Sequence, residues 1–343
     1  MGMGKWTGKV VLILVAAVLM AGFIPIQSWI EDERVANNLK QPFQLTNLRD
    51  LPLEKVTGTL FTGVLSGFRG IVVDILWMKM DTAWDQGRSD LIVPILNAIT
   101  MLDPHFMDAW EMSAWHEAYN LTAKAISKYG QWDWSVREGP IKDGLAVLEK
   151  GVKWNPTRSQ LYWYMGEIYY NKMGDQEKAA EWWLKAAECS DHPKWVARFV
   201  AHAYENAPDF DKALYWYYMA EKESPNNATQ PGAVITIRER YLPAWQAYKR
   251  GDLKEAERLI NNTLEDYLPT NRLARHFLAN ILEKEGRNQE ALEEWERCFA
   301  ISKSDAGALR RAYELREKMG IPQPTSQELE DKWWIVTGSF TGS

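Results

Sequence analysis

The chain has 343 residues, of which 46% are apolar and 25% charged, a composition that is typical of globular proteins and excludes disorder for most of the length. Its net charge is -6, and acidic and basic residues are mixed along it without a basic block, so we expect no nucleic acid partner. The two cysteines, Cys189 and Cys298, are too few for a disulfide framework or a cysteine-based metal site.

Residues 1–30 are predicted to form a transmembrane anchor. No residue from Val10 to Ile30 is charged, and this stretch is long enough for a helix to cross the hydrocarbon of a bilayer. Lys5 and Lys9 precede it and acidic residues follow it, so the positive-inside rule places the amino terminus in the cytoplasm. The body is then periplasmic or extracellular. A cleaved signal peptide is the alternative to a retained, single-pass anchor in the cell membrane.

Residues 31–68 are interpreted as a connector that leads into a second apolar segment. The run from Val56 to Val73 contains one charge, Arg69, and glycines at a spacing of four, which let helices pack closely in membranes. If this segment crossed the bilayer, the body would lie in the cytoplasm. Burying Arg69 would cost about 2.5 to 3.5 kcal/mol, which favours a surface helix or the first helix of the following region.

An internal repeat is clearest from Lys194 to Asn227. Small residues stand where the two helices of one repeat would cross closely: Ala201, Ala213 and Ala220. Tyr204 and Tyr217 would fill the groove between repeats, and Pro225 would end the second helix. The pattern resembles the tetratricopeptide repeat (TPR), which implies a stack of helix pairs.

The same pattern recurs on both sides of this repeat. The preceding unit is marked by Gly166, Ala179, Trp183 and Ala186. Its turn, Met173 to Asp175, is one residue longer. The two following units are marked by Ala244, Gly251 and Ala256, and by Ala279, Gly286, Ala291, Trp295 and Cys298. Upstream the signal is weaker, and an insertion from about Thr122 to Pro140, with Trp132 and Trp134, is predicted to form a loop or an extra helix.

The sequence therefore predicts an all-α protein. We expect an α-solenoid of about six TPR-like helix pairs over residues 69–304, followed by a capping helix and an aromatic tail over residues 305–343. The capping helix is predicted from Ala306 to Met319, and the tail, Lys332 to Val336, would cover the cap or dock a partner. The stretches FRGIVVDILWMKMDTAWDQGR, LDPHF and AWHEAYN are similar to those of membrane-anchored bacterial repeat proteins without an assigned activity.

A partner-binding face is predicted along the first helix of each pair. In proteins with this repeat, the first helices line the concave side of the stack, and aromatic rings beside charged groups suit peptide binding. The candidate residues at these positions are Trp77, Trp84, Trp115, Trp163, Tyr170, Trp195, Arg198, His202, Arg238, Tyr241, Trp245 and Tyr248. The alternative is that several of these rings pack between the repeats.

No catalytic, cofactor or metal site is predicted. His116-Glu117 begins like a zinc-protease motif, but Asn120 stands where the second histidine should be. We therefore expect a membrane-anchored scaffold that binds a protein or peptide and is not an enzyme. Carriage of a hydrophobic small molecule or lipid, and a permanent place in a larger envelope complex, are the alternatives.

Overall fold

The computed structural model describes residues 69–224, 231–266 and 269–333, and all regular structure in these ranges is helical. The chain divides into two compact units. The described part of the first unit is residues 69–113 with 153–156, and that of the second is residues 114–152 with those from 157 onward. The predicted anchor and most of the segment 56–73 lie outside the described residues. None of the described helices combines the length and the apolar character that crossing a membrane requires.

The first unit contains a helix pair, α3 (Arg69–Asp85) and α4 (Ser89–Leu102). Met80 and Ile92 occupy positions where the repeat pattern expects small residues, and both are 2% exposed. They pack with Val73, Leu96 and Ile99 into one apolar cluster. The helix pair therefore forms although the residues at its contact positions are larger than those of the usual repeat.

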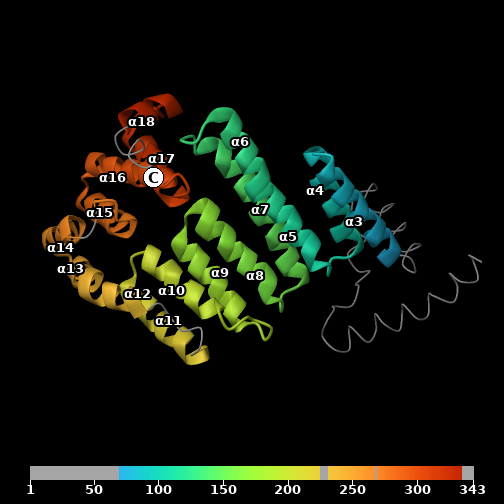
Figure 1. The fold of residues 1–343 in the computed structure, drawn as a ribbon, viewed down its shortest axis with the longest axis horizontal. Helices are drawn as coiled ribbons and strands as arrows, with labels where there is room; N and C mark the ends of the chain where they lie inside the picture. The colour runs from blue at the N-terminus through green and yellow to red at the C-terminus, as the bar shows by residue number, and fades with distance from the viewer. Residues whose placement is uncertain (1–68, 225–230, 267–268, 334–343) are drawn as a thin grey trace, which may run out of the picture. The chain divides into compact units, whose positions relative to one another are not determined.

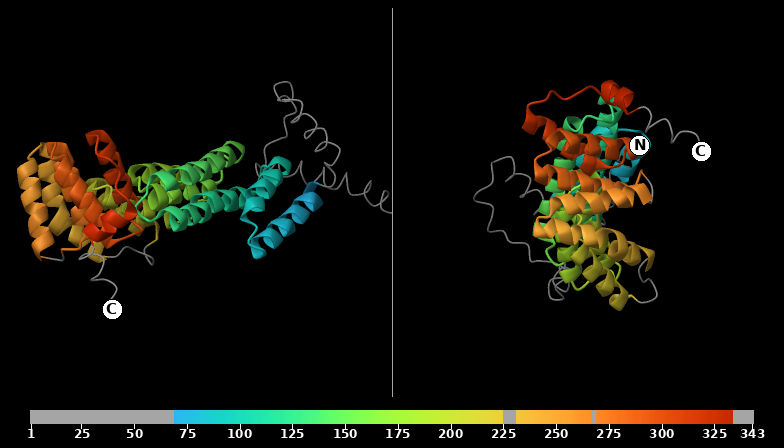
Figure 2. Two further views of the ribbon diagram at one scale, coloured as in Figure 1. Left: turned by 90° about the horizontal axis from the view of Figure 1, so that it is seen from above. Right: turned by 90° about the vertical axis from the view of Figure 1, so that its left-hand side faces the viewer.

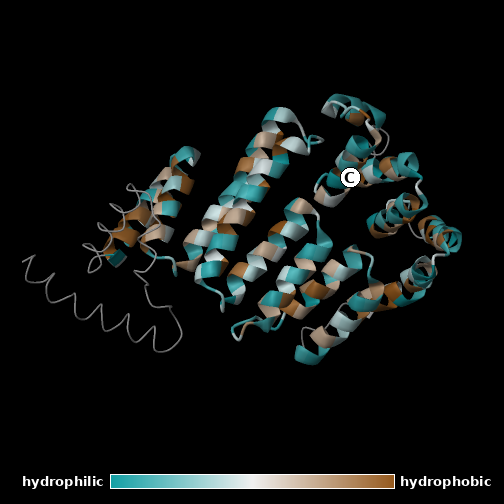
Figure 3. Ribbon diagram, turned by 180° about the vertical axis from the view of Figure 1, so that it is seen from behind, coloured by the Kyte–Doolittle hydropathy of each residue, from teal (hydrophilic) through white to brown (hydrophobic). Residues whose placement is uncertain are grey.

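The second unit is a succession of helices that begins at the end of α5 (Met107–Trp115). Three segments within it are π-helical: η3 (His116–Leu121), η4 (Tyr169–Met173) and η6 (Ile237–Tyr241). The α-helices that follow α5 are α6 (Thr122–Tyr129), α7 (Ser135–Trp154), α8 (Ser159–Ile168), α9 (Gln176–Glu188), α10 (Val196–Asn206), α11 (Phe210–Glu223), α12 (Pro231–Thr236), α13 (Leu242–Arg250), α14 (Leu253–Asp266), α15 (Arg272–Glu285), α16 (Asn288–Ile301), α17 (Ala306–Met319) and α18 (Ser326–Lys332). Apolar and polar stripes alternate along these helices (Figure 3), because each helix buries one face.

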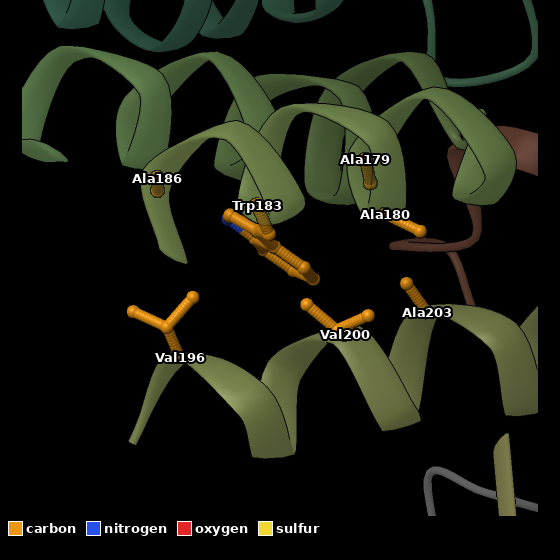
Figure 4. Packing of buried hydrophobic residues seen from close by; sticks show 7 residues of the cluster. All are labelled: Ala179, Ala180, Trp183, Ala186, Val196, Val200 and Ala203. Atoms are coloured by element: carbon orange, nitrogen blue, oxygen red, sulfur yellow. The ribbon is translucent and has the colours of Figure 1, made fainter. Parts of the chain in front are cut away.

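Small residues set the close approach of neighbouring helices. Figure 4 shows Trp183 of α9 facing Val196 and Val200 of α10, with alanines on both sides. A Cβ atom on Gly166 would overlap the Trp183 ring, so glycine is what lets α8 accept this ring. Ala201, Ala213 and Ala220, in the clearest repeat from Lys194 to Asn227, are buried as the pattern predicts. The helices are thus arranged in TPR-like pairs, which confirms the predicted all-α class.

The extra residue predicted in the turn from Met173 to Asp175 lies instead in the preceding helix. The segment η4 is π-helical, which takes up one residue more than α-helical geometry would. The helix ends at Gly174 in the left-handed conformation, with φ of 60°. Asp175 then caps α9 by accepting from the Lys178 backbone N–H. The register of the repeat is kept because the insertion is absorbed before the turn.

The insertion at about 122–140 forms α6, a short loop and the first turns of α7. Trp132 and Trp134 in the loop are 5% and 2% exposed. The ring of Trp132 packs edge-on against Phe299 of α16, with ring centroids 4.8 Å apart. Trp132 therefore joins two parts of the second unit that are far apart in sequence.

The second unit closes on itself, whereas the sequence predicts an open stack with a cap. Figure 1 shows its helices following one another around a curve that brings α17 back towards α9, and Figure 2 shows the same succession from two other sides. Gly174 touches Gly307 at the start of α17, where a Cβ atom on Gly307 would lie 2.9 Å from the Gly174 carbonyl oxygen. Arg310 Nε donates to the Met173 carbonyl oxygen over 2.9 Å. We call the contacts of Gly174, Gly307, Arg310 and Trp132 the closure.

Candidate functional site

Four side chains of α8 and α10 form an aromatic surface on the second unit. The Trp163 ring contacts the rings of Trp195 and Phe199 edge-on, with centroids 4.3 and 4.7 Å apart. Arg198 lies over Phe199, 5.6 Å from its ring centroid. We call Trp163, Trp195, Arg198 and Phe199 the tryptophan edge.

Trp183, which is 1% exposed, supports the tryptophan edge on its buried side. Trp183 stacks on Trp163 with centroids 5.1 Å apart, and its Nε1 donates to the Trp163 carbonyl oxygen over 3.1 Å. Trp195, at the start of α10, keeps 37% of its surface exposed. A large ring is thus open to solvent on a rigid support.

Tyr170 and His202, which neighbour this edge, are engaged in hydrogen bonds inside the unit. Tyr217 donates to a Glu205 carboxylate oxygen over 2.5 Å, and its hydroxyl lies 2.9 Å from His202 Nδ1. Asn206 Nδ2 donates to the Tyr170 hydroxyl oxygen over 3.0 Å. Burial raises the pKa of the Tyr217 and Tyr170 hydroxyls, and the Glu205 charge adds to both effects. These residues order the helices around the edge.

Trp245 and Tyr248 belong to a second aromatic cluster around Phe277. Their stacked rings lie 5.5 Å apart, and each is within 6.1 Å of the Phe277 ring. Trp245 Nε1 and Lys249 Nζ both donate to the Asp211 carboxylate, over 3.1 and 2.7 Å, which holds its pKa below the usual range. These rings pack between repeats and retain partly exposed edges.

The remaining predicted residues are scattered. Tyr241 is 2% exposed and donates to Asn271 Oδ1 over 3.1 Å, so almost none of it is open to a partner. Arg238 is exposed. Trp115 is 36% exposed and stacks on Tyr119. Trp77 and Trp84 lie in the first unit, where Trp77 packs on Phe106 and Trp84 is 42% exposed.

The structure thus brings Trp163, Tyr170, Trp195, Arg198 and His202 together, stacks Trp245 on Tyr248 in a second cluster, and disperses the other five predicted residues. The sequence reasoning did not name Phe199, which contacts Trp195, and named Trp183 only as a repeat position, although Trp183 supports both Trp163 and Phe199. The spacing of Phe199, four residues after Trp195 on one helix, is the signal that could have found it.

His116 and Asn120, the residues of the incomplete zinc-protease motif, contact each other. Asn120 Nδ2 lies 3.1 Å from His116 Nδ1. Within the described ranges no three side chains of the metal-binding types come together.

A cavity of about 610 Å³ lies inside the second unit, beside the closure. Its lining contains four cationic side chains and one carboxylate: Arg137, Lys172, Arg272, Lys303 and Asp305. None of the five was predicted as a site residue. They come from four separate parts of the sequence and only the closure brings them together.

The fold and these surfaces together define a helical repeat protein with TPR-like pairs. No protein-family model and no curated protein matches the sequence. Among solved structures, the chain is similar to the MamA protein, with 13% identity, a TM-score of 0.33, and coverage of 73% of this chain and 95% of that one.

Two further solved structures are also similar to the chain at low sequence identity. A tetratricopeptide repeat protein from Parabacteroides merdae shares 13% identity, with a TM-score of 0.38 and coverage of 78% of this chain and 98% of that one. Yeast Tom70 shares 15% identity, with a TM-score of 0.23 and coverage of 80% of this chain and 62% of that one. The assignment of paired helices therefore depends on the geometry described above.

Proposed function

We propose that this protein is a scaffold that binds a segment of a partner protein on the tryptophan edge of its second unit. The observation that supports this is the Trp195 ring, which is 37% exposed yet held between Trp163 and Phe199. Tryptophan and arginine are the residues that most often dominate binding energy at protein interfaces, particularly where the ring is already ordered. Arg198 stands beside the rings and offers a partner a charged contact.

The membrane location is part of the same proposal. Its support is the uncharged stretch from Val10 to Ile30 with lysines before it and acidic residues after it. An anchor there would hold the helical body outside the cytoplasm at a short distance from the bilayer. The scaffold would then present the tryptophan edge to proteins of the cell envelope.

The experiment compares partner recovery by the full chain and by a Trp195→Ala variant. Proteins crosslinked to each in native membranes are recovered and quantified by mass spectrometry, and the affinity of each recovered partner is then measured. We expect Trp195→Ala to weaken binding by about 2 kcal/mol, or roughly 30-fold, because it removes the exposed centre of the surface.

Tyr218→Ala is the matched control. Tyr218 is an exposed aromatic residue of α11, with 64% of its surface open, and it lies outside the tryptophan edge. Both variants should remain folded, which circular dichroism checks. If the two variants lose the same partners, or neither loses any, the tryptophan edge is not the binding surface.

A further inference from the structure

The cavity beside the closure has a strong excess of positive charge. Arg137 comes from α7, Lys172 from η4, Arg272 from α15 and Lys303 from the turn before α17. Cations from separate elements repel one another unless an anion lies between them. Bringing these four cations together therefore costs electrostatic free energy, which another interaction must offset.

The one carboxylate in the lining, Asp305, is already engaged. Its Oδ2 lies 2.6 Å from His276 Nε2 and 3.4 Å from Arg272 Nη1, and its Oδ1 accepts from the Ala308 backbone N–H over 3.1 Å. Asp305 is 4% exposed. Asp305 is therefore paired with His276 and Arg272. Arg137, Lys172 and Lys303 have no carboxylate partner in the lining.

Several buried polar atoms in the lining have unused hydrogen-bonding capacity. Arg137 is 7% exposed and its Nη2 donates to the Gln131 carbonyl oxygen, but its Nε has no partner within the described ranges. The same holds for Lys303 Nζ, Thr122 Oγ1 and Gln176 Oε1. Four such atoms on residues that line one cavity are unusual, because buried polar groups in native proteins are nearly always paired.

The electrostatic effect on the three cations agrees with this geometry. Burial, with the Arg137 charge as a smaller contribution, lowers the pKa of Lys303 to about 8 and also lowers the pKa of Lys172. Burial lowers the pKa of Arg137 to about 10. Asp133, Glu167 and Glu330 oppose these shifts from a distance without reversing them.

Aromatic rings give the two lysines a weaker form of stabilisation. Lys303 Nζ lies 3.8 Å from the centre of the Trp132 ring, and Lys172 Nζ lies 3.9 Å from that of Tyr119. Such contacts orient an ammonium group but leave its N–H donors available to an anion. The rings therefore hold the lysines ready at the cavity.

We propose that this cavity binds a small organic or inorganic anion that carries at least two negative charges, of the phosphate or polycarboxylate class. Arg137, Lys172 and Lys303 would contact the charged groups, and Thr122 and Gln176 would bond the neutral polar part. The volume of about 610 Å³ admits more than a single oxyanion. The ligand would join α7, η4 and the turn before α17, and so strengthen the closure.

The test measures thermal unfolding of the full chain in inorganic phosphate, pyrophosphate and citrate, against chloride at equal ionic strength. We expect at least one of the three anions, at a hundred times its Kd, to raise Tm by roughly 5 to 10 °C. Titration calorimetry gives the Kd directly. A response to the phosphates alone or to citrate alone identifies the class of ligand, and no response to any of the three overturns the proposal.

Variants separate binding in the cavity from a general effect of salt. Lys303→Met and Lys172→Met should each weaken anion binding at least 10-fold while Tm in chloride stays the same or rises, since each removes an uncompensated cation. Lys212→Met is the control, because Lys212 is an exposed cation on α11 paired with Asp209. Equal stabilisation of all three variants by the anion would refute the site. If Lys303→Met fails to fold, Lys172→Met decides the question in the same way.

The anion site is independent of the proposed partner surface. Trp195→Ala should leave the anion-dependent rise in Tm unchanged, because Trp195 does not line the cavity. Failure of one proposal can therefore be distinguished from failure of the other.

Discussion

At the scale of single residues, Asp305 shows how one buried carboxylate serves several groups. It caps α17, lies 2.6 Å from His276 and pairs with Arg272. Burial by itself would raise its pKa, but His276, Arg272 and the Ala308 N–H together lower the pKa to about 2. The folded protein therefore stabilises the ionised form of Asp305.

Replacing Asp305 by Asn should change how stability depends on pH. The pKa of Asp305 is about 2 in the folded protein and near 3.9 for an ordinary aspartate. Ionised Asp305 therefore adds about 2 to 3 kcal/mol to the free energy of unfolding, and the whole of this contribution is present above pH 4. This contribution is lost as the pH falls from about 4 to about 2. Urea unfolding at several pH values should show the difference between wild type and Asp305→Asn shrinking over that range. Asp209→Asn, at the half-buried cap of α11, is the matched control for replacing a capping carboxylate by an amide.

Single residues also show where the sequence reasoning was sufficient. Ala201, Ala213 and Ala220 are buried because closely crossing helices require small side chains. Their spacing in the sequence was enough to predict their burial. The predicted binding face was harder to judge. Spacing places both Trp195 and Tyr241 on the predicted face, but whether a ring is covered depends on its neighbours, and Phe210 stacks on Tyr241 with centroids 5.2 Å apart.

At the scale of helices, α17 begins against the turn after η4, and glycine is required there. Gly307 is helical and its φ is not positive, so alanine would ordinarily favour the helix. A Cβ atom at Gly307 would lie 2.9 Å from the Gly174 carbonyl oxygen. The close approach therefore outweighs the helix propensity.

Gly307→Ala should destabilise the protein by about 1 to 3 kcal/mol, because the added methyl group pushes α17 away from Gly174. Gly232→Ala is the control at a helical glycine with open space around it, and it should be neutral or slightly stabilising. Urea unfolding monitored by circular dichroism measures both. A stabilised Gly307→Ala variant would mean that α17 does not pack as described.

The sequence predicted where most helices lie better than it predicted their local geometry. The segments η3, η4 and η6 are π-helical, and the sequence carries no simple mark of them, because a π-helical turn differs from an α-helical one by only one residue. The extra residue near Gly174 was noticed in the sequence but assigned to the turn. The described helix α18 was not predicted, since its seven residues are too short for periodicity to show.

At the scale of the molecule, the closure distinguishes the second unit from an open solenoid. In an open stack each repeat contacts only its neighbours, so damage at one end stays local. Here Trp132 packs on Phe299, and Arg310 donates to Met173. The two ends of the curve therefore depend on each other.

Hydrogen exchange should reveal this dependence. In a Gly174→Val variant, we expect faster amide exchange in residues 131–141, 169–176 and 299–310, which the closure joins, and little change in α14. Exchange measured by mass spectrometry resolves these peptides. Faster exchange confined to 169–176 would show that the two ends unfold independently.

Neither the closure nor the cationic cavity could be predicted from the sequence. The curvature of a solenoid is the sum of small rotations at every helix pair, and a pattern of alanines and tyrosines does not fix any of them. Arg137 and Lys303 look like ordinary surface cations until the curve brings them to one cavity. The repeats were predictable because they depend on local spacing, whereas the site depends on accumulated geometry.

The closure also has a consequence for the order in which this protein folds. The bond from Arg310 to Met173 joins residues 137 positions apart, while the contacts within each helix pair are local. Local pairs form quickly, and a contact that closes so long a loop is entropically slower. On a ribosome, the helices up to α15 can therefore assemble as an open chain, and the cavity becomes complete only after α16 and the start of α17 have emerged.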